Sequence, residues 1–172
     1  SLFCGSMPIS TSYTWTGTNS SAWSNTGNWS PSGIPTSIDN VIINSPGTNT
    51  LNITDCRVVK DFTLAGTGNF RANATAVLTI NGSVNYGGSA TANLDCASQV
   101  NIKSATAQTV PPLNFGNLNV LGGNRIFANM GTIGICSGFN VNPLLYNYTV
   151  TGSTVNYFSP AAGWVMTPFT YN

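Results

Sequence analysis

Residues 78–84 read Leu-Thr-Ile-Asn-Gly-Ser-Val, and 55 positions further on residues 133–139 read Ile-Gly-Ile-Cys-Ser-Gly-Phe. The same offset relates Gln-Val-Asn-Ile at residues 99–102 to Thr-Val-Asn-Tyr at residues 154–157. In a chain rich in strand-forming residues, a repeat of fixed period predicts stacked units, each of which buries its apolar face against its neighbours. The pattern therefore favours a rod-like or surface module over an enzyme built around a pocket.

The amino-acid composition limits the classes of molecule that this chain is expected to bind. Charged residues make up only 5 % of the 172 residues, against roughly 25 % in an ordinary globular domain, while Asn, Ser and Thr together exceed a third. The net charge is +1 and the five basic residues are scattered, so we expect no nucleic-acid binding. No apolar stretch approaches the roughly 18 residues of a membrane-spanning helix.

Short apolar runs recur between Gly, Asn and Ser turns, and most alternate apolar with polar residues, as in residues 77–80, 100–102 and 155–157. Alternation with period two predicts strands with one buried face. Tight hairpin signals are scarce, since only Asn81-Gly82 qualifies. We therefore predict an all-β, mostly parallel β-helix or solenoid with two to three rungs in each repeat; a β-sandwich is the alternative.

Changes in composition and in hydrophobic periodicity along the chain predict three regions. Residues 1–12 show no periodicity and read as a flexible arm or tag. Residues 13–40 are rich in turn residues and contain Trp15, Trp23 and Trp29, which predicts a cap over the open end of the solenoid. Residues 41–172 form the expected solenoid of about 55-residue repeats, of which the last is incomplete.

The inward positions of the expected strands define a single continuous core. These positions are Val41, Ile43, Phe62, Leu64, Leu78, Ile80, Val100, Ile102, Leu118, Val120, Ile133, Ile135, Val155 and Tyr157.

Four cysteines, Cys4, Cys56, Cys96 and Cys136, are widely spaced and form no Cys-x-x-Cys motif. Because the chain contains no His, a zinc site is not expected. An even count with wide spacing fits disulfides in an oxidising compartment, and buried free thiols are the alternative. The sequence does not select among the three possible pairings.

The acidic residues give little support to catalysis. The chain contains four Asp and no Glu or His, and only Asp55 and Asp95 are candidates for a pair across adjacent rungs. Capping of a turn by each Asp is the favoured interpretation. We therefore predict a protein that is not an enzyme and holds no cofactor or metal.

Exposed aromatic rings are the candidate basis of carbohydrate binding. Trp15, Trp23, Trp29 and Trp164 could stack on sugar faces, or they could be buried cap and core residues. A carbohydrate-binding module is therefore the alternative function.

The end of the sequence begins a new unit at Phe169, Tyr171 and Asn172 and stops there. Either the chain is a segment of a longer repeat protein, or this end pairs head-to-tail with another copy. A head-to-tail contact need not close into a ring and can build a filament.

Several short motifs resemble large secreted surface proteins of the Bacteroidetes, which are exported by the type IX system and include adhesin-like repeat proteins. The motifs that open the resemblance are Trp15-x-Gly17, Trp23 followed by Asn28-Trp29, Gly33-Ile34-Pro35, and Asp39-Asn40-Val41-Ile42-Ile43. Later motifs of the same kind lie at residues 58–64, 107–118 and 153–157. The resemblance implies an extracellular β-solenoid used as a stalk or adhesive surface, and it implies no catalytic residues.

Together these observations predict a non-enzymatic structural or adhesive protein at the bacterial cell surface, either a stalk or a self-assembling filament subunit. Its expected partners are other copies of itself or neighbouring repeats of a longer chain, with surface glycans as a further possibility.

Overall fold

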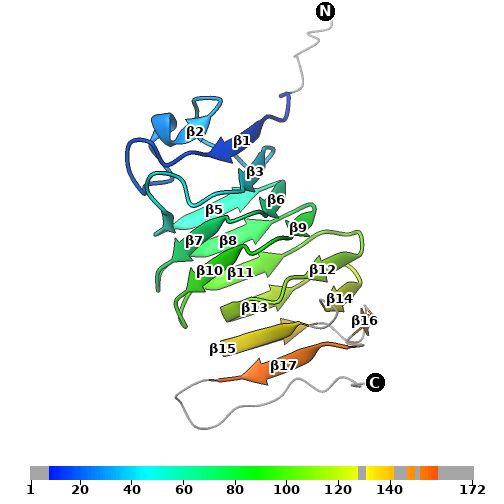
Figure 1. Cartoon of the computed structure of the whole chain (residues 1–172). Coiled ribbons are helices and arrows are strands. Elements are labelled where there is room, and N and C mark those ends of the chain that lie inside the picture. The colour runs from blue at the N-terminus through cyan, green and yellow to red at the C-terminus, as the bar shows by residue number, and fades with distance from the viewer. Residues whose placement is uncertain (1–7, 128–130, 142–146, 150–151, 159–172) are drawn as a thin grey trace, which may run out of the picture.

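The computed structural model describes residues 8–127, 131–141, 147–149 and 152–158. The chain is all-β, and its parallel strands stack into a solenoid of about five turns (Figure 1). The solenoid expected from the alternating strands is thereby confirmed.

The first face begins as a five-stranded sheet in the order β2-β1-β3-β6-β9, in which only the β1–β2 pair is antiparallel. Further along the same side, β12, β14 and β16 form a parallel sheet. The strands of this face are β1 (Ser12–Trp15), β2 (Trp29–Ser30), β3 (Asn40–Ile43), β6 (Asp61–Leu64), β9 (Val84–Tyr86), β12 (Gln108–Val110), β14 (Arg125–Phe127) and β16 (Tyr148–Thr149).

The second face is a parallel sheet of β4 (Leu51–Ile53), β7 (Asn69–Ala72) and β10 (Thr91–Leu94). The third face belongs to a six-stranded parallel sheet that starts at β5 and ends at β17, and the last three strands of this sheet extend onto the second face. Its strands are β5 (Cys56–Val59), β8 (Val77–Ile80), β11 (Gln99–Ile102), β13 (Asn114–Val120), β15 (Thr132–Val141) and β17 (Thr154–Tyr157).

Two long strands bend from the second face onto the third. The register between β13 and β15 shifts between Phe115 and Asn117, and β13 also contacts β10. The strand β17 pairs only with the first half of β15. The amino-terminal halves of β13 and β15, together with β17, therefore continue the second face, and the carboxyl-terminal halves of β13 and β15 continue the third.

From β3 onward, paired residues on successive turns lie 17 to 23 positions apart, as for Thr109 with Ile126 and Ile126 with Thr149. The structural period is thus a turn of this length, and the longer repeat seen in the sequence spans more than two turns. Leu78 stands in a column with Val100, Leu118 and Phe139, whereas its sequence counterpart Ile133 pairs with Val155. The segments matched in the sequence therefore occupy different columns of the solenoid.

The expected core positions are confirmed, since twelve of the fourteen are buried and the other two, Val155 and Tyr157, are partly buried against the core. The buried residues form two clusters, one in the amino-terminal turns and one in the carboxyl-terminal turns. Val84, Leu94 and Leu113 pack against both clusters and join them. A cavity of about 20 Å³ with almost wholly apolar walls lies at this junction.

Polar side chains fill inward positions where β12 and β14 replace β9 on the first face. The side-chain oxygen of Gln108 accepts a hydrogen bond from the backbone N–H of Val84 at 2.9 Å, in the place of a strand pairing. The fully buried Arg125 donates to backbone carbonyl oxygens of both its own and the preceding turn, including those of Ser104 and Asn124. The hydrogen bonds of Gln108 and Arg125 therefore connect the carboxyl-terminal turns to the first three turns of the solenoid.

Candidate functional site

The amino-terminal end is closed by a cluster of aromatic rings. The indole of Trp29 makes edge-to-face contacts with Trp15 and Trp23, each at 4.9 Å between ring centroids, and with Tyr13 at 6.5 Å. All three tryptophans are at most 3 % exposed. The three rings are therefore packed into the core at this end and offer no exposed face on which a sugar could stack.

Backbone contacts hold the tryptophans in place. The indole N–H of Trp29 donates to the carbonyl oxygen of Trp23 at 2.8 Å, and that of Trp15 donates to Asn49 at 2.9 Å. Asn28, at the end of the short helix η1 (Thr26–Asn28), is fully buried. Its side-chain oxygen accepts hydrogen bonds from the backbone N–H groups of Asn19 and Ser20, so it organises the loop that precedes Trp23.

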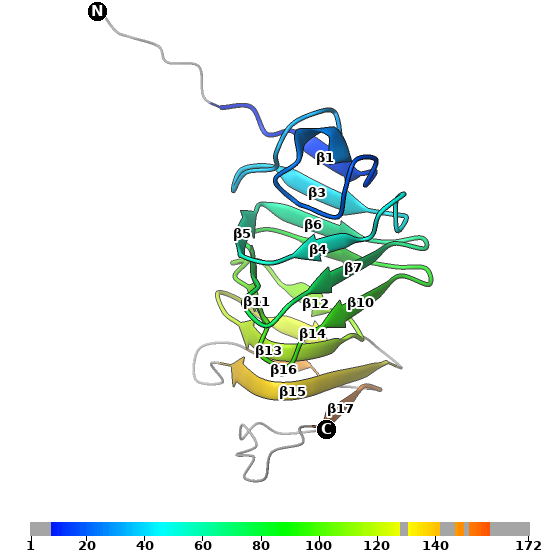
Figure 2. The ribbon, with the colours of Figure 1, turned by 90° about the vertical axis from the view of Figure 1, so that its left-hand side faces the viewer.

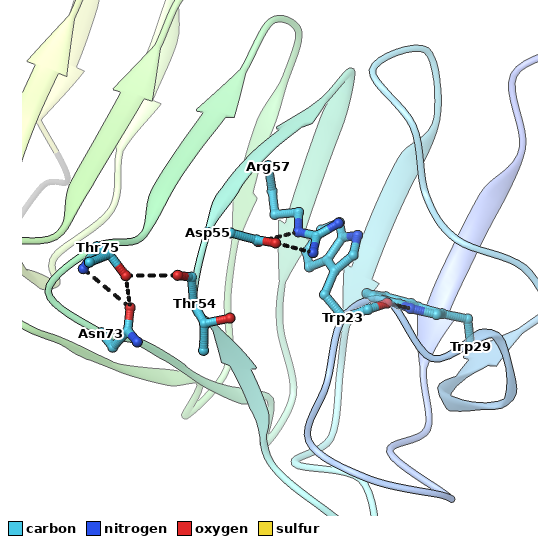
Figure 3. Close-up of polar contacts among 7 residues, drawn as sticks. All are labelled: Trp23, Trp29, Thr54, Asp55, Arg57, Asn73 and Thr75. Carbon is cyan, nitrogen blue, oxygen red and sulfur yellow. Dashed lines mark hydrogen bonds and ion pairs between the residues drawn. The ribbon is translucent and has the colours of Figure 1, made fainter.

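Figure 3 shows the corner where the cap meets the second and third faces. The guanidinium of Arg57 donates to both carboxylate oxygens of Asp55 at 2.6 Å and lies 5.6 Å from the ring centre of Trp23. Arg57 pairs in register with the inward residue Leu78. A charged side chain thus occupies the core column on the first strand of the third face, and its planar group covers the edge of the cap.

The same corner in the next turn is held by hydroxyl and amide groups (Figure 3). The hydroxyl of Thr75 donates to the carbonyl oxygen of Thr54 at 2.7 Å and contacts the side-chain oxygen of Asn73 at 3.0 Å. The corner is therefore tied both within one turn and between two turns.

Each of the four aspartates binds groups of the protein itself. Asp95 caps its turn by accepting from the backbone N–H of Ala97 at 2.8 Å, and Asp61 accepts from Ser83 in the next turn at 2.6 Å. Asp55 pairs with Arg57. A whole turn of the solenoid separates Asp55 from Asp95, so these two do not form the pair across adjacent rungs that the sequence allowed.

Asp39 anchors the start of β1 to the loop before β3. Its carboxylate accepts from the backbone N–H groups of Thr11 and Thr36 and from the hydroxyl of Thr36, at 2.7 to 2.9 Å. Burial acts to raise the pKa of Asp39, but the hydrogen bonds outweigh it and hold the pKa below its usual value. The group is therefore a structural anchor that stays ionised.

The structure pairs Cys96 with Cys136 in a disulfide, with 5.2 Å between their Cα atoms. Cys96 is exposed in the corner after β10, and Cys136 is buried where β15 bends. Gly116, the corner of the turn between them, packs against the backbone of the Cys96 loop. The bond therefore spans the intervening turn, while Cys56 is exposed and carries a free thiol.

Outward side chains on the third face bond to one another. The amide of Asn101 donates to the hydroxyl of Thr79 at 2.9 Å, and the amide of Asn119 donates to the side-chain oxygen of Asn101 at 2.7 Å. The side chain of Gln99 adds a third bond to Asn101 at 2.9 Å. The polar groups of this ladder are engaged within the face itself.

The second face carries two adjoining open hollows instead, which together are called the groove below. A hollow of about 370 Å³ is lined by residues that include Ser21, Thr48 and Asn49, and a hollow of about 260 Å³ is lined by residues that include Asn73 and Asp95. The two hollows share Asn52 and Arg71. Sequence reasoning missed this groove, because its residues come from three turns and form no local motif.

Several sequence-based candidates lie outside the described residues, namely Cys4, Trp164, Phe169, Tyr171 and Asn172. Within the part of the chain that the structure describes, no group of three or more Cys or Asp is arranged to hold a metal ion. In that same part, no helix has the length and hydrophobicity needed to span a membrane.

Comparison with known proteins gives one finding about the family. The search of curated proteins and the search of solved structures each returned no match. A family model described as a domain of unknown function, DUF8693, matches residues 14–130, which contain the cap and the first four turns. More than half of the chain is covered, and the chain belongs to the DUF8693 family.

Proposed function

We propose that this protein is a non-enzymatic, extracellular structural or adhesive protein, either a cell-surface stalk or a self-assembling filament subunit. Its β-solenoid fold is compatible with a structural repeat protein. The observation that carries the proposal is the third face, where the strands from β5 to β15 pair in parallel over the length of the rod. Such continuity supplies length and stiffness, which a stalk needs and a catalytic pocket does not.

The disulfide supports a location outside the cytoplasm. Bonds such as Cys96–Cys136 persist in oxidising compartments and are rare where thiols are kept reduced. The resemblance to type IX-exported adhesin-like proteins points the same way. Alkylation of thiols in intact cells, followed by mass spectrometry, should recover the bonded pair; recovery of both cysteines alkylated would contradict the location.

The amino-terminal end is poorly suited to adding strands. The first strand of the third face, β5, is flanked by Asp55 and Lys60 and contains Arg57, and charged residues on an edge strand oppose further pairing. Aromatic rings cover the adjoining core. We therefore propose the opposite end of the solenoid for any contact with a second copy or with neighbouring repeats; the sequence-based candidates Phe169, Tyr171 and Asn172 lie outside the described residues.

The catalytic alternative receives no support from the described carboxylates, because each of them is bound to protein groups. A carbohydrate-binding module that uses Trp15, Trp23 and Trp29 is disfavoured because these rings are buried.

Negative-stain electron microscopy at several concentrations tests the proposal, with a variant ending before Pro168 beside the full chain. Filaments that vanish on truncation would identify an assembly subunit, and isolated short rods in both samples would identify a stalk segment. Absence of filaments from the full chain at every concentration would contradict the filament subunit, since one copy of five turns is only about 24 Å long.

A further inference from the structure

Three outward side chains of the second face stand in one column across successive turns. Asn52 of β4 pairs in register with Arg71 of β7, which pairs in turn with Asn93 of β10. Figure 2 shows these three strands stacked one below another. Because neighbouring strands lie roughly 4.8 Å apart, the column presents an amide, a guanidinium and an amide at regular intervals.

The polar groups of this column are free, in contrast to those of comparable columns nearby. Within the described residues, the side chains of Asn52, Arg71 and Asn93 make no hydrogen bond or ion pair. The neighbouring outward pair, Asn69 and Thr91, bond to each other, as the amides of the third face do. The column therefore retains donors and acceptors that a ligand can use.

The column also stands in the groove. Asn52 and Arg71 line both hollows, and the hollows extend toward opposite ends of the strands, one to Thr48 and the other to Asp95. A ligand that fills the groove crosses all three turns and can contact the side chains of Asn52, Arg71 and Asn93.

The chemistry of the groove favours a neutral, polyhydroxylated ligand. The single cation Arg71 and the single anion Asp95 among its lining residues balance, and the rest are mainly amide and hydroxyl side chains with one Ala. A nucleic acid would need several cations for its phosphates. An extended peptide would pair with a sheet edge and place side chains in pockets, whereas this groove lies on a sheet face.

We propose that the groove on the second face binds a neutral polysaccharide, with Asn52, Arg71 and Asn93 contacting successive hydroxyl groups of one chain. This inference names the ligand class of the proposed adhesive function and rests on it. The planar guanidinium of Arg71 can donate two parallel hydrogen bonds to neighbouring oxygen atoms of a sugar chain. Because no aromatic ring lines the groove, hydrogen bonds supply the recognition.

An array of neutral glycans, followed by affinity electrophoresis in gels that contain the best neutral polysaccharide, tests the proposal. The test variant carries Asn52→Ala, Arg71→Ala and Asn93→Ala together. Asn85→Ala is the matched control, because Asn85 is an exposed outward amide on the first face. Circular dichroism should give all three proteins the same melting temperature, since the replaced side chains lie outside the core.

We expect binding to at least one neutral glycan, a fall in its association constant of about tenfold or more in the triple variant, and no change in Asn85→Ala. Absence of binding to every neutral glycan would overturn the inference, as would equal binding by the triple variant. Stronger binding to anionic alginate that disappears in salt would overturn it too. Rods seen by microscopy would leave the structural role intact in each of these cases, so the two proposals fail separately.

Discussion

Gly116 lies at a corner where backbone atoms of the preceding turn leave no room for a side chain. A Cβ atom at this position would lie 2.2 Å from the carbonyl oxygen of Asp95 and 2.7 Å from that of Ser98. Because both neighbours are backbone atoms, the Gly116→Ala variant can fold only by shifting the corner. We expect it to lower the free energy of unfolding by about 2–4 kcal/mol, as measured by urea denaturation.

Gly87→Ala is the matched control, because no atom lies within 4 Å of a Cβ built there. Its stability should stay the same or rise by up to about 1 kcal/mol. Equal losses in the two variants would show that the crowding at Gly116 is not the cause.

The contribution of Asp39 to the stability of the fold depends on pH. Because the pKa of Asp39 is lowered by its hydrogen bonds, its carboxylate stabilises the fold above about pH 4, the ordinary pKa of Asp. This contribution is lost as the pH falls through the folded-state pKa. We expect Asp39→Asn to be less stable at pH 7 by about 1–3 kcal/mol, and this difference to shrink in acid.

Urea denaturation of both proteins between pH 7 and pH 2 measures this effect. Asp95→Asn is the control, because its carboxylate accepts one bond from Ala97 in an exposed turn, and its loss at pH 7 should be smaller. A difference between wild type and Asp39→Asn that stays constant with pH would contradict the assignment.

At this scale the sequence predicted which side chains are buried but not what the polar ones contact. Alternation with period two placed Leu78 and Ile80 correctly, because each strand has one buried face. The same alternation predicts apolar residues at the inward positions that Arg57, Gln108 and Arg125 occupy. Their partners come from other turns, which a local pattern does not encode.

At the scale of elements, the disulfide joins the corner after β10 to the bend of β15 and closes a loop of 40 residues. Such a loop restricts the unfolded chain by about 4 kcal/mol in the chain-entropy description. We expect Cys96→Ser to lower stability by roughly that amount, as measured by thermal melting, and reductant to lower the melting temperature of wild type but not of the variant.

Cys56→Ser serves as the control, because this exposed thiol is free, and its melting temperature should match wild type in oxidising buffer. A loss in Cys56→Ser as large as that in Cys96→Ser would mean that the pairing is different.

The spacing of the strands shows which features of the solenoid could be found from the internal repeat of the sequence and which could not. The long repeat in the sequence identified stacking correctly, because inward apolar positions recur in every turn. It did not reveal the shorter period of a single turn, since loops of unequal length separate the strands and successive turns from β3 onward differ by 17 to 23 residues. The groove on the second face was missed for the related reason that Asn52, Arg71 and Asn93 meet only after stacking.

At the scale of the whole molecule, the strands support one another only through their neighbours, so damage in a central turn should spread. Ile80 is 2 % exposed and pairs with Val59 and Ile102 on the turns before and after it. Ile80→Asp places an unpaired charge in the core and should cost more than about 4 kcal/mol. We expect loss of the strand signal in circular dichroism at room temperature.

Thr109→Asp is the control for this variant, because it adds the same charge at an exposed outward position of β12, and it should keep the wild-type spectrum. A melting curve for Ile80→Asp that matches wild type would show that the core is assigned wrongly.

In the stalk that we propose, the chain would carry tension, and the Cys96–Cys136 bond limits how far the chain can be extended. Pulled from its ends, the chain can unravel turn by turn, but the 40 residues closed by the bridge stay outside the path of the load. Their extended length would be roughly 130–140 Å. An oxidised rod therefore stretches less than a reduced one by about that distance, so the redox state of this one bond sets how far the chain can extend.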